Sequence, residues 1–301
     1  MMPELADLVR AKPTQEAGLT HLAKDMINLA RYPIATPGPA RDAVLARVRD
    51  ALDARGCAVL KGFLTPEGIA AAVTEAEGVA DKGHHNYSRT NPYFTKDDPT
   101  LPETDPRRRF FDRSNAFIPA DNFRPEGPLR TVFDSDGFDD FIRDCLRQPA
   151  DRFFRYADPL ADVIVNAAGE GNGFPWHFDT NNFTVTLALQ NAESGGAFEY
   201  APMIRDRDDE HFDEVAKVLD GTSDRVVSLN LEPGDLQLFK GRYSLHRVAP
   251  LSGPVPRYVA IFSYVEEPGM VGSVERTRQL YGRTLPVHHE RAGQRGDALV
   301  D

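Results

Sequence analysis

The stretch FTVTLALQ (183–190) is short, rich in β-branched and apolar residues and bounded by Asn residues, which predicts a β-strand. Similar stretches precede and follow it, each bounded by Gly, Pro, Asn or Asp. They are DVIVNAAG (162–169), WHFD (176–179), GAFEYAP (196–202), RVVSLNLE (225–232), DLQLFKG (235–241), SLHRVAPL (244–251) and RYVAIFSYVEE (257–267). Eight short strands within about a hundred residues indicate an all-β sandwich or barrel, and a jelly roll is the expected form.

Helices are expected to flank this core, so the fold class is mainly β with a jelly-roll, cupin-like core. One helix is predicted at 41–56, ending at Gly56, and another begins after Thr65-Pro66-Glu67, where Thr is a suitable N-cap. Between them, 57–64 is an apolar run typical of a strand. Further helices are predicted at 137–148 and 211–221.

We expect a single domain over 1–301, with four parts. These are N-terminal helices and a first strand (1–82), a lid-like loop region (83–135), the jelly-roll core (136–270) and a C-terminal extension (271–301). The second part is rich in Pro, Asp, Asn and Arg and has neither helical nor strand periodicity, and a long loop of this kind is usually functional or disordered. Its scattered aromatic residues favour an ordered cover.

The overall charge restricts the partners. The net charge is −11 and the pI is near 5.2, which argues against a nucleic-acid or anionic-membrane surface. The two cysteines, Cys57 and Cys145, are too few for a disulfide framework and favour a reducing compartment, so the expected location is the cytoplasm. Neither a signal peptide nor a membrane span is expected. The expected partner is a small-molecule substrate, and the sequence is silent on the oligomeric state.

A candidate metal site begins at His177 and Asp179, which are two residues apart in a predicted strand and should point to the same face. Alone, this pair is a weak signal. His246 follows near the end of the strand region, and two histidines with one carboxylate leave three coordination positions open. That set is the facial triad of non-haem Fe(II) oxygenases, and no thiolate is nearby to favour a structural zinc site.

Arg257 opens the strand that follows His246. A buried guanidinium can hold a carboxylate through two hydrogen bonds. A triad with such an arginine suits a 2-oxo-acid cosubstrate, whose oxo-acid end takes two iron positions while its distal carboxylate binds the cation and O2 takes the third position. The expected cofactors are therefore Fe(II), 2-oxoglutarate and O2.

The chain resembles the Fe(II)/2-oxoglutarate-dependent dioxygenases through HFDTNNFTVTLALQ (177–190), GGAFEY (195–200), PGDLQLFKGRYSLHRVAP (233–250) and RYVAIFSY (257–264). Within them it is most similar to the standalone free-amino-acid halogenases and their hydroxylase relatives, some of which act on lysine. The resemblance implies that the halogenases of this group carry glycine at the position where this chain has Asp179. A carboxylate there occupies the halide position, so we expect a hydroxylase of lysine or a similar free amino acid, which releases succinate and CO2.

Further contacts are assigned by region. In the lysine-acting members polar or acidic side chains are expected around the first metal histidine, whereas Phe174 and Thr180 stand there in this chain. The candidate 2-oxoglutarate contacts besides Arg257 are Asn166, Thr186 and Ser263. The candidate substrate contacts are Asp162, Trp176, Thr180, Tyr281 and Arg113, with Asn115 and Arg283 as weaker ones.

Two alternatives remain open at this point. The same iron chemistry could desaturate, epimerise or cyclise its substrate, because the fate of a substrate radical depends on how the substrate is placed. A jelly roll with a carboxylate pocket could also be a non-catalytic binding module, although such a module does not require three metal ligands. A macromolecular substrate is a further alternative, and the acidic surface disfavours nucleic acid.

Overall fold

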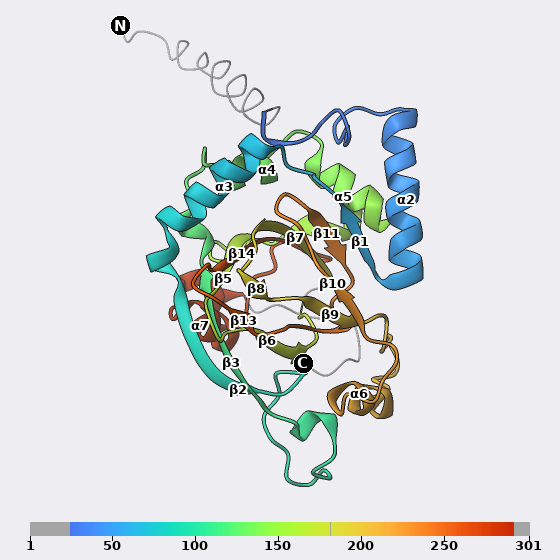
Figure 1. Cartoon of the computed structure of the whole chain (residues 1–301), viewed down its shortest axis with the longest axis vertical. Coiled ribbons are helices and arrows are strands. Elements are labelled where there is room, and N and C mark those ends of the chain that lie inside the picture. Colours follow the sequence, from blue (N-terminus) through green and yellow to red (C-terminus); the bar gives the residue numbers. More distant parts are fainter. Residues whose placement is uncertain (1–24, 181, 292–301) are drawn as a thin grey trace, which may run out of the picture.

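The computed structural model describes residues 25–180 and 182–291, and two β-sheets dominate it (Figure 1). The major sheet has eight strands and is antiparallel. Its order is β1 (Cys57–Leu60), β11 (Leu236–Phe239), β7 (Phe183–Gln190), β14 (Arg257–Val265), β5 (Val163–Ala168), β3 (Phe111–Ile118) and β2 (His84–Thr90), with β4 (Phe154–Arg155) pairing with β14. The minor sheet runs β10 (Val227–Leu229), β9 (Phe198–Ala201), β12 (Leu245–Val248) and β6 (Phe174–His177).

The chain passes from one sheet to the other at two places that matter for the site. The minor-sheet strand β6 leads directly into β7 of the major sheet, and β11 of the major sheet leads into β12 of the minor sheet. A short ladder of β8 (Ser194–Gly195) and β13 (Leu251–Ser252) closes one end. This is the expected jelly roll, mainly β with flanking helices, and the two crossings bring Asp179 and Gly241 into contact.

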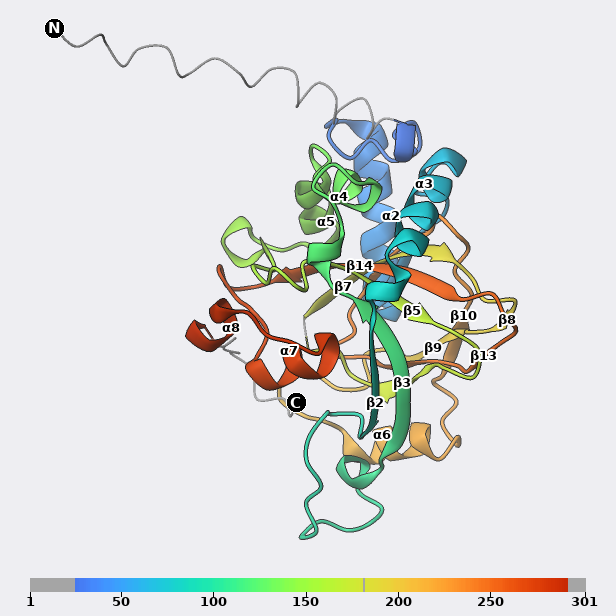
Figure 2. The same ribbon diagram turned by 90° about the vertical axis from the view of Figure 1, so that its left-hand side faces the viewer.

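Four helices cover the outer face of the major sheet and bury the largest apolar core (Figures 1 and 2). They are α2 (Pro39–Arg55), α3 (Pro66–Gly78), α4 (Pro128–Phe133) and α5 (Phe138–Leu146). The predicted helix starts and stops agree with the observed ones: α2 ends at Gly56 in a left-handed conformation, and the Thr65 hydroxyl accepts a hydrogen bond from the Gly68 N–H (3.0 Å).

Three more helices lie elsewhere. Helix α6 (Phe212–Leu219) packs its apolar face on a smaller core beneath the minor sheet, which contains Trp176 and Phe178. Helices α7 (Val274–Tyr281) and α8 (Pro286–Glu290) form the described part of the C-terminal extension, and residues 292–301 lie outside the described residues. Among the described residues, none of the helices combines the length and the apolar character that a membrane crossing requires.

One expectation about secondary structure was wrong. The region 83–135 was predicted to be a loop, but it contains two strands and a helix. Strands β2 and β3 pair with each other over seven residues and join the major sheet, and helix α4 follows them. Strand β2 is an edge strand whose side chains alternate between partly buried and exposed, and its sequence HHNYSRT is polar on both faces. Strand β3 buries Arg113 and Asn115, so neither strand has the apolar alternation on which a sequence-based prediction depends.

Candidate metal centre

His177 and His246 face each other across the minor sheet. The two residues are direct partners in the antiparallel ladder of β6 and β12, and their ring centroids are 4.1 Å apart. Both are buried, with 8% and 5% of their surfaces exposed. The sequence predicted that Asp179 lies in the same strand as His177. Strand β6 ends at His177, however, so Asp179 lies just after the strand. Phe178 between them points to the opposite side and is fully buried among the aromatic residues of the smaller core.

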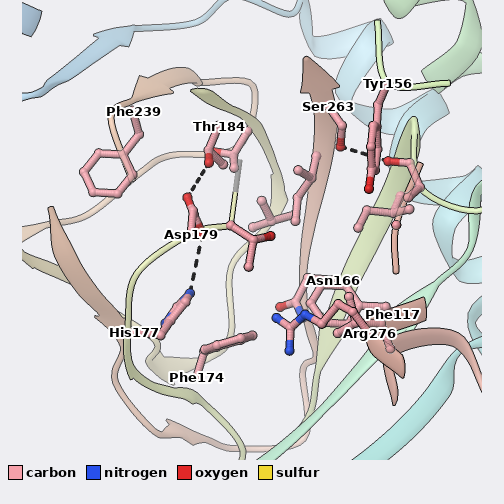
Figure 3. Close-up of a pocket in the computed structure, with 18 of the residues that line it drawn as sticks. Phe117, Tyr156, Asn166, Phe174, His177, Asp179, Thr184, Phe239, Ser263 and Arg276 are labelled. Atoms are coloured by element: carbon pink, nitrogen blue, oxygen red, sulfur yellow. Dashed lines mark hydrogen bonds and ion pairs between the residues drawn. The ribbon is translucent and has the colours of Figure 1, made fainter. Parts of the chain in front are cut away.

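The Asp179 carboxylate completes the cluster (Figure 3). Its Oδ1 lies 3.3 Å from Nε2 of His246 and 3.7 Å from Nε2 of His177. One ligand atom from each of the three residues lies within 4.8 Å of the others. Two imidazoles and one carboxylate, without a thiolate, form a donor set that suits Fe(II) and leaves coordination positions open.

The backbone sets the orientation of both imidazoles. Nδ1 of His177 lies 2.8 Å from the Pro175 carbonyl oxygen, and Nδ1 of His246 lies 2.9 Å from the Ser244 carbonyl oxygen. A carbonyl only accepts hydrogen bonds, so each Nδ1 carries a proton and each Nε2 is the ring nitrogen that faces the centre and could bind a metal. Burial and the adjacent His246 also lower the pKa of His177 well below its ordinary value, so this imidazole stays neutral.

The carboxylate is held on its other side by two neighbours. The Thr184 hydroxyl on β7 donates a short hydrogen bond to Oδ2 of Asp179. The Asp179 N–H donates to the Gly241 carbonyl oxygen (3.1 Å), which fixes the backbone. Burial opposes ionisation of Asp179, but His246, His177 and Thr184 outweigh it and hold the carboxyl pKa below its usual range. The group is therefore an anion at neutral pH and a suitable ligand.

Thr184 thus orients a ligand without belonging to the donor set. Replacing Thr184 by Val keeps the shape and removes the hydrogen bond to Asp179. We expect the affinity for Fe(II) or the turnover rate to fall about 10- to 100-fold, the usual cost of losing such an outer contact. Iron titration and kcat should be measured beside Thr74→Val, which removes an exposed hydroxyl that bonds only within α3. Equal values for the two variants would contradict the orienting role.

The triad opens into one cavity of about 210 Å³ between the sheets. Arg257 at the start of β14 lines this cavity and is buried, with 7% of its surface exposed. No carboxylate among the described residues forms an ion pair with it, and burial alone lowers its pKa to about 10. The guanidinium therefore remains protonated at neutral pH. An anionic ligand would supply the counter-charge that the described residues do not provide.

Five other predicted residues also line the cavity: Asn166, Thr180, Thr186, Ser263 and Tyr281. Three of them already have hydrogen-bond partners, since Asn166 donates to the Ala116 carbonyl (3.4 Å), Thr186 to the Gln237 side chain (2.9 Å) and Ser263 to the Ala161 carbonyl (2.8 Å). Their positions suit contacts to a ligand, and their roles in binding stay predictions.

The structure does not bring three predicted substrate residues into the cavity wall. Asp162 forms an ion pair with Arg130 (2.5 and 2.8 Å) and accepts a hydrogen bond from the Val163 N–H, so it has a structural partner already. Trp176 precedes His177 and therefore points to the other face of β6, into the smaller core. Arg113 is fully buried behind aromatic side chains of the wall. Of the weaker candidates, Asn115 accepts a hydrogen bond from Arg113, and Arg283 pairs with Asp121.

Sequence reasoning missed several residues of the wall. Arg276 and Thr277 of α7, Asp158 before β5 and Phe94 after β2 all line the cavity. The stretch PGMVGSVERTRQLYGR (268–283), already part of the family resemblance, could have indicated the first two, because it places Thr277 one helical turn before Tyr281 and Arg276 beside it. Asp158 and Phe94 carry no comparable signal.

Solved structures with a similar fold share this architecture. SnoK, described as a non-haem alpha-ketoglutarate-dependent carbocyclase from nogalamycin biosynthesis, has a TM-score of 0.51 at 14% identity and covers 73% of this chain and 83% of its own. SnoN, the epimerase of the same biosynthesis, has a TM-score of 0.50 at 15% identity, covering 75% and 84%. AviO1 from Streptomyces viridochromogenes Tue57 has a TM-score of 0.50 at 18% identity, and the match covers 77% of this chain and 98% of AviO1.

These similarities show the fold, and within it His177, Asp179 and His246 form a donor set that could hold Fe(II). The family model described as Halogenase D matches residues 40–279, which is most of the chain, and the chain belongs to that family. A comparison with curated protein sequences finds no match.

Proposed function

We propose that this chain hydroxylates a free amino acid, using Fe(II), 2-oxoglutarate and O2. The observation that carries the proposal is the pairing of two features in one cavity: a cluster of two imidazoles and an ionised carboxylate, and a buried arginine without an anionic partner among the described residues. A pure binding module would need the second feature and not the first.

Each residue has one role in this scheme. His177, Asp179 and His246 would hold the iron, and Arg257 would bind the distal carboxylate of 2-oxoglutarate. The chemistry that Fe(II) supplies when bound is activation of O2, so that one oxygen atom enters a substrate C–H bond and the other enters 2-oxoglutarate, giving the alcohol, succinate and CO2. The aromatic wall around the triad, which includes Phe174 and Phe239, limits the access of water to the reacting atoms.

Asp179 supports hydroxylation over halogenation. In the halogenases that the sequence resembles, glycine stands at this position and leaves room for a halide. Here Thr184 and Gly241 fix a carboxylate in that place. Membership of the Halogenase D family is thus compatible with a hydroxylase, and the side chain at position 179 makes the difference.

The test is an anaerobic titration of the apo-protein with Fe(II) and then 2-oxoglutarate, followed by visible absorption and then by O2 with each amino acid. We expect the absorption band of an Fe(II)–2-oxo-acid chelate, succinate formation and a product that gains one oxygen atom. A product that loses two hydrogen atoms indicates desaturation, and an unchanged mass with altered stereochemistry indicates epimerisation. No band at full iron loading would overturn the proposal in favour of a binding module.

Arg257 gives a sharper test of the cosubstrate. Arg257→Gln removes the cation, and we expect the KM for 2-oxoglutarate to rise about 100-fold, the scale for truncating one partner of a buried charge pair. Arg247→Gln is the matched control, because Arg247 follows His246 but points away from the cavity and pairs with Glu199. A KM for 2-oxoglutarate that is the same in both variants would show that Arg257 does not anchor it.

A further inference from the structure

Phe94 lines the cavity in a backbone conformation that bulky residues rarely adopt. Four described residues other than glycine have a positive φ, and Phe94 is the one among them that lines the cavity. Its φ is 58°, in the left-handed region that favours glycine. An aromatic residue persists in this region only where the surrounding structure enforces the conformation, and such positions cluster at functional sites.

A β-turn over residues 91–94 enforces this conformation. The Phe94 N–H donates a hydrogen bond to the Asn91 carbonyl oxygen (3.2 Å), and Pro92 at the second position has a fixed φ that suits a turn. The Asn91 side chain is fully buried, and both of its polar atoms are bonded. Its Oδ1 accepts from the Tyr93 and Thr95 N–H groups (3.1 Å each), and its Nδ2 donates to the Thr95 hydroxyl (2.8 Å). These bonds hold the chain on both sides of Phe94.

The same turn is bonded to the segment that carries two of the triad residues. Phe178, which lies between those two residues, donates its N–H to the Pro92 carbonyl oxygen (2.9 Å). The Phe178 ring also packs against Tyr93, with 5.3 Å between ring centroids. The turn and the triad segment are therefore directly connected, and Phe94 keeps a fixed position relative to the triad.

The Phe94 ring covers the cavity beside the first histidine of the triad. Its centroid lies 5.7 Å from that of the His177 ring, and the guanidinium carbon of Arg276 on α7 lies 4.0 Å from it. A group that approaches the triad from this side meets the ring. Because the backbone of Phe94 is held, the ring could move aside only by a change of rotamer, which the contacts with His177 and Arg276 oppose.

These contacts favour a fixed wall over a mobile lid. Segments that open locally have few buried contacts and many backbone groups in water. Here Asn91 and Pro92 are buried, and the Asn91 Nδ2 also donates to the Arg107 carbonyl oxygen (2.5 Å), which ties the turn to the far end of the loop that follows it. This part of the predicted cover therefore limits the cavity by its position and not by opening.

We propose that Phe94 is a specificity-determining residue: a fixed stop, held by the Asn91 turn, that limits the size of the substrate part lying next to the metal. This inference rests on the proposed function and adds to it the residue that sets the size limit.

The experiment measures size selection at the metal itself. The full-length protein is loaded with Co(II), whose visible absorption changes when a ligand enters its coordination sphere, and is titrated with imidazole and with 4-phenylimidazole. Phe94→Gly removes the ring and keeps a residue that suits a positive φ. We expect the affinity for 4-phenylimidazole relative to imidazole to rise about 10-fold or more, the scale on which apolar pockets discriminate by size.

The control for the loss of a ring is Tyr87→Ala. Tyr87 is 74% exposed and lies on the edge strand β2, outside the cavity wall, so its loss should leave the selection between the two imidazoles unchanged. The same shift in Tyr87→Ala as in Phe94→Gly would overturn the role of Phe94, because the effect would then not depend on the cavity.

A second variant separates the ring from the backbone. Phe94→Ala also lacks the ring, but alanine is disfavoured at a positive φ. We expect the same change in size selection as in Phe94→Gly, together with a lower midpoint of thermal unfolding than Phe94→Gly has. Equal midpoints for the two variants would overturn the role of the turn, because they would show that the backbone is not held in the left-handed conformation.

Turnover gives a further readout and separates this inference from the proposed function. With Fe(II), 2-oxoglutarate and O2, Phe94→Gly should raise kcat/KM about 10-fold or more for amino acids with larger side chains than the wild type prefers. Co(II) binding with the same selection between imidazoles in the wild type and Phe94→Gly overturns the role of Phe94 and leaves the oxygenase intact. A shift in selection without turnover of any amino acid supports the role of Phe94 and overturns the amino-acid substrate.

Discussion

Asp179→Gly is expected to abolish the proposed hydroxylation, with at least about a 100-fold loss of oxidised product, because loss of the proposed metal ligand costs no less than loss of its outer contacts. The Asp179 carboxylate faces Nε2 of both histidines and is ionised at neutral pH, so its removal takes away one of three donors and the only negative charge among them. Product formation and iron content after Fe(II) loading measure the effect.

The control is Asp162→Asn, which alters a carboxylate that pairs with Arg130 outside the cavity. In a chloride buffer, mass spectrometry of the Asp179→Gly reaction also tests the link to the halogenases that the sequence resembles, since the glycine would leave a position for chloride. A chlorinated product would show that this one side chain selects hydroxylation. Hydroxylation at the wild-type rate would contradict the role of Asp179 as a ligand.

The barrel and the triad could be predicted from sequence because both depend on local patterns. Short β-branched runs specify the strands, and the order His177, Asp179, His246 is typical of one kind of metal site. What brings the ligands together is not local: His246 is the ladder partner of His177 only because β12 and β6 pair in one particular register. A shift by one residue would turn the His246 side chain to the other face.

The predictions that placed other residues in the cavity were wrong for a different reason. Trp176 and Asp162 are of types that occur in binding sites, but the first is turned away by strand alternation and the second is occupied by Arg130. Strands β2 and β3 were not predicted because β2 is polar on both faces, and β3 buries polar side chains such as Arg113 against aromatic rings. Such roles depend on neighbours that are distant in sequence.

Gly241 is the clearest case of a site residue that only the structure identifies. It follows β11 at the crossing into the minor sheet, and a Cβ at this position would lie 1.8 Å from Oδ2 and 2.6 Å from Cγ of Asp179. The carboxylate cannot simply move aside, because the Asp179 backbone is bonded to the Gly241 carbonyl and Oδ2 is bonded to Thr184. The smallest side chain would thus push the Asp179 carboxylate out of the candidate metal centre.

Gly241→Ala is therefore expected to lower kcat/KM about 100-fold or more. Loss of a residue that only orients a metal ligand costs up to about 100-fold, and here the proposed ligand itself would be displaced. The fold should persist, because the clash is confined to the site, and circular dichroism and thermal unfolding would check this. Gly78→Ala is the matched control, since a Cβ there meets no atom within 4 Å. A Gly241→Ala variant with wild-type activity would contradict the prediction that the Asp179 carboxylate must occupy this position.

A double-mutant cycle decides whether Gly241 acts through Asp179. Interacting residues show non-additive effects, whereas independent ones add within about 0.3–0.5 kcal/mol. Iron affinity is the readout, because it remains measurable when turnover is lost. If the alanine at 241 acts only by displacing the carboxylate, it should weaken iron binding in the wild-type background and leave it unchanged in Asp179→Gly. Equal losses in both backgrounds would show that Gly241 supports the crossing between the sheets and not the ligand.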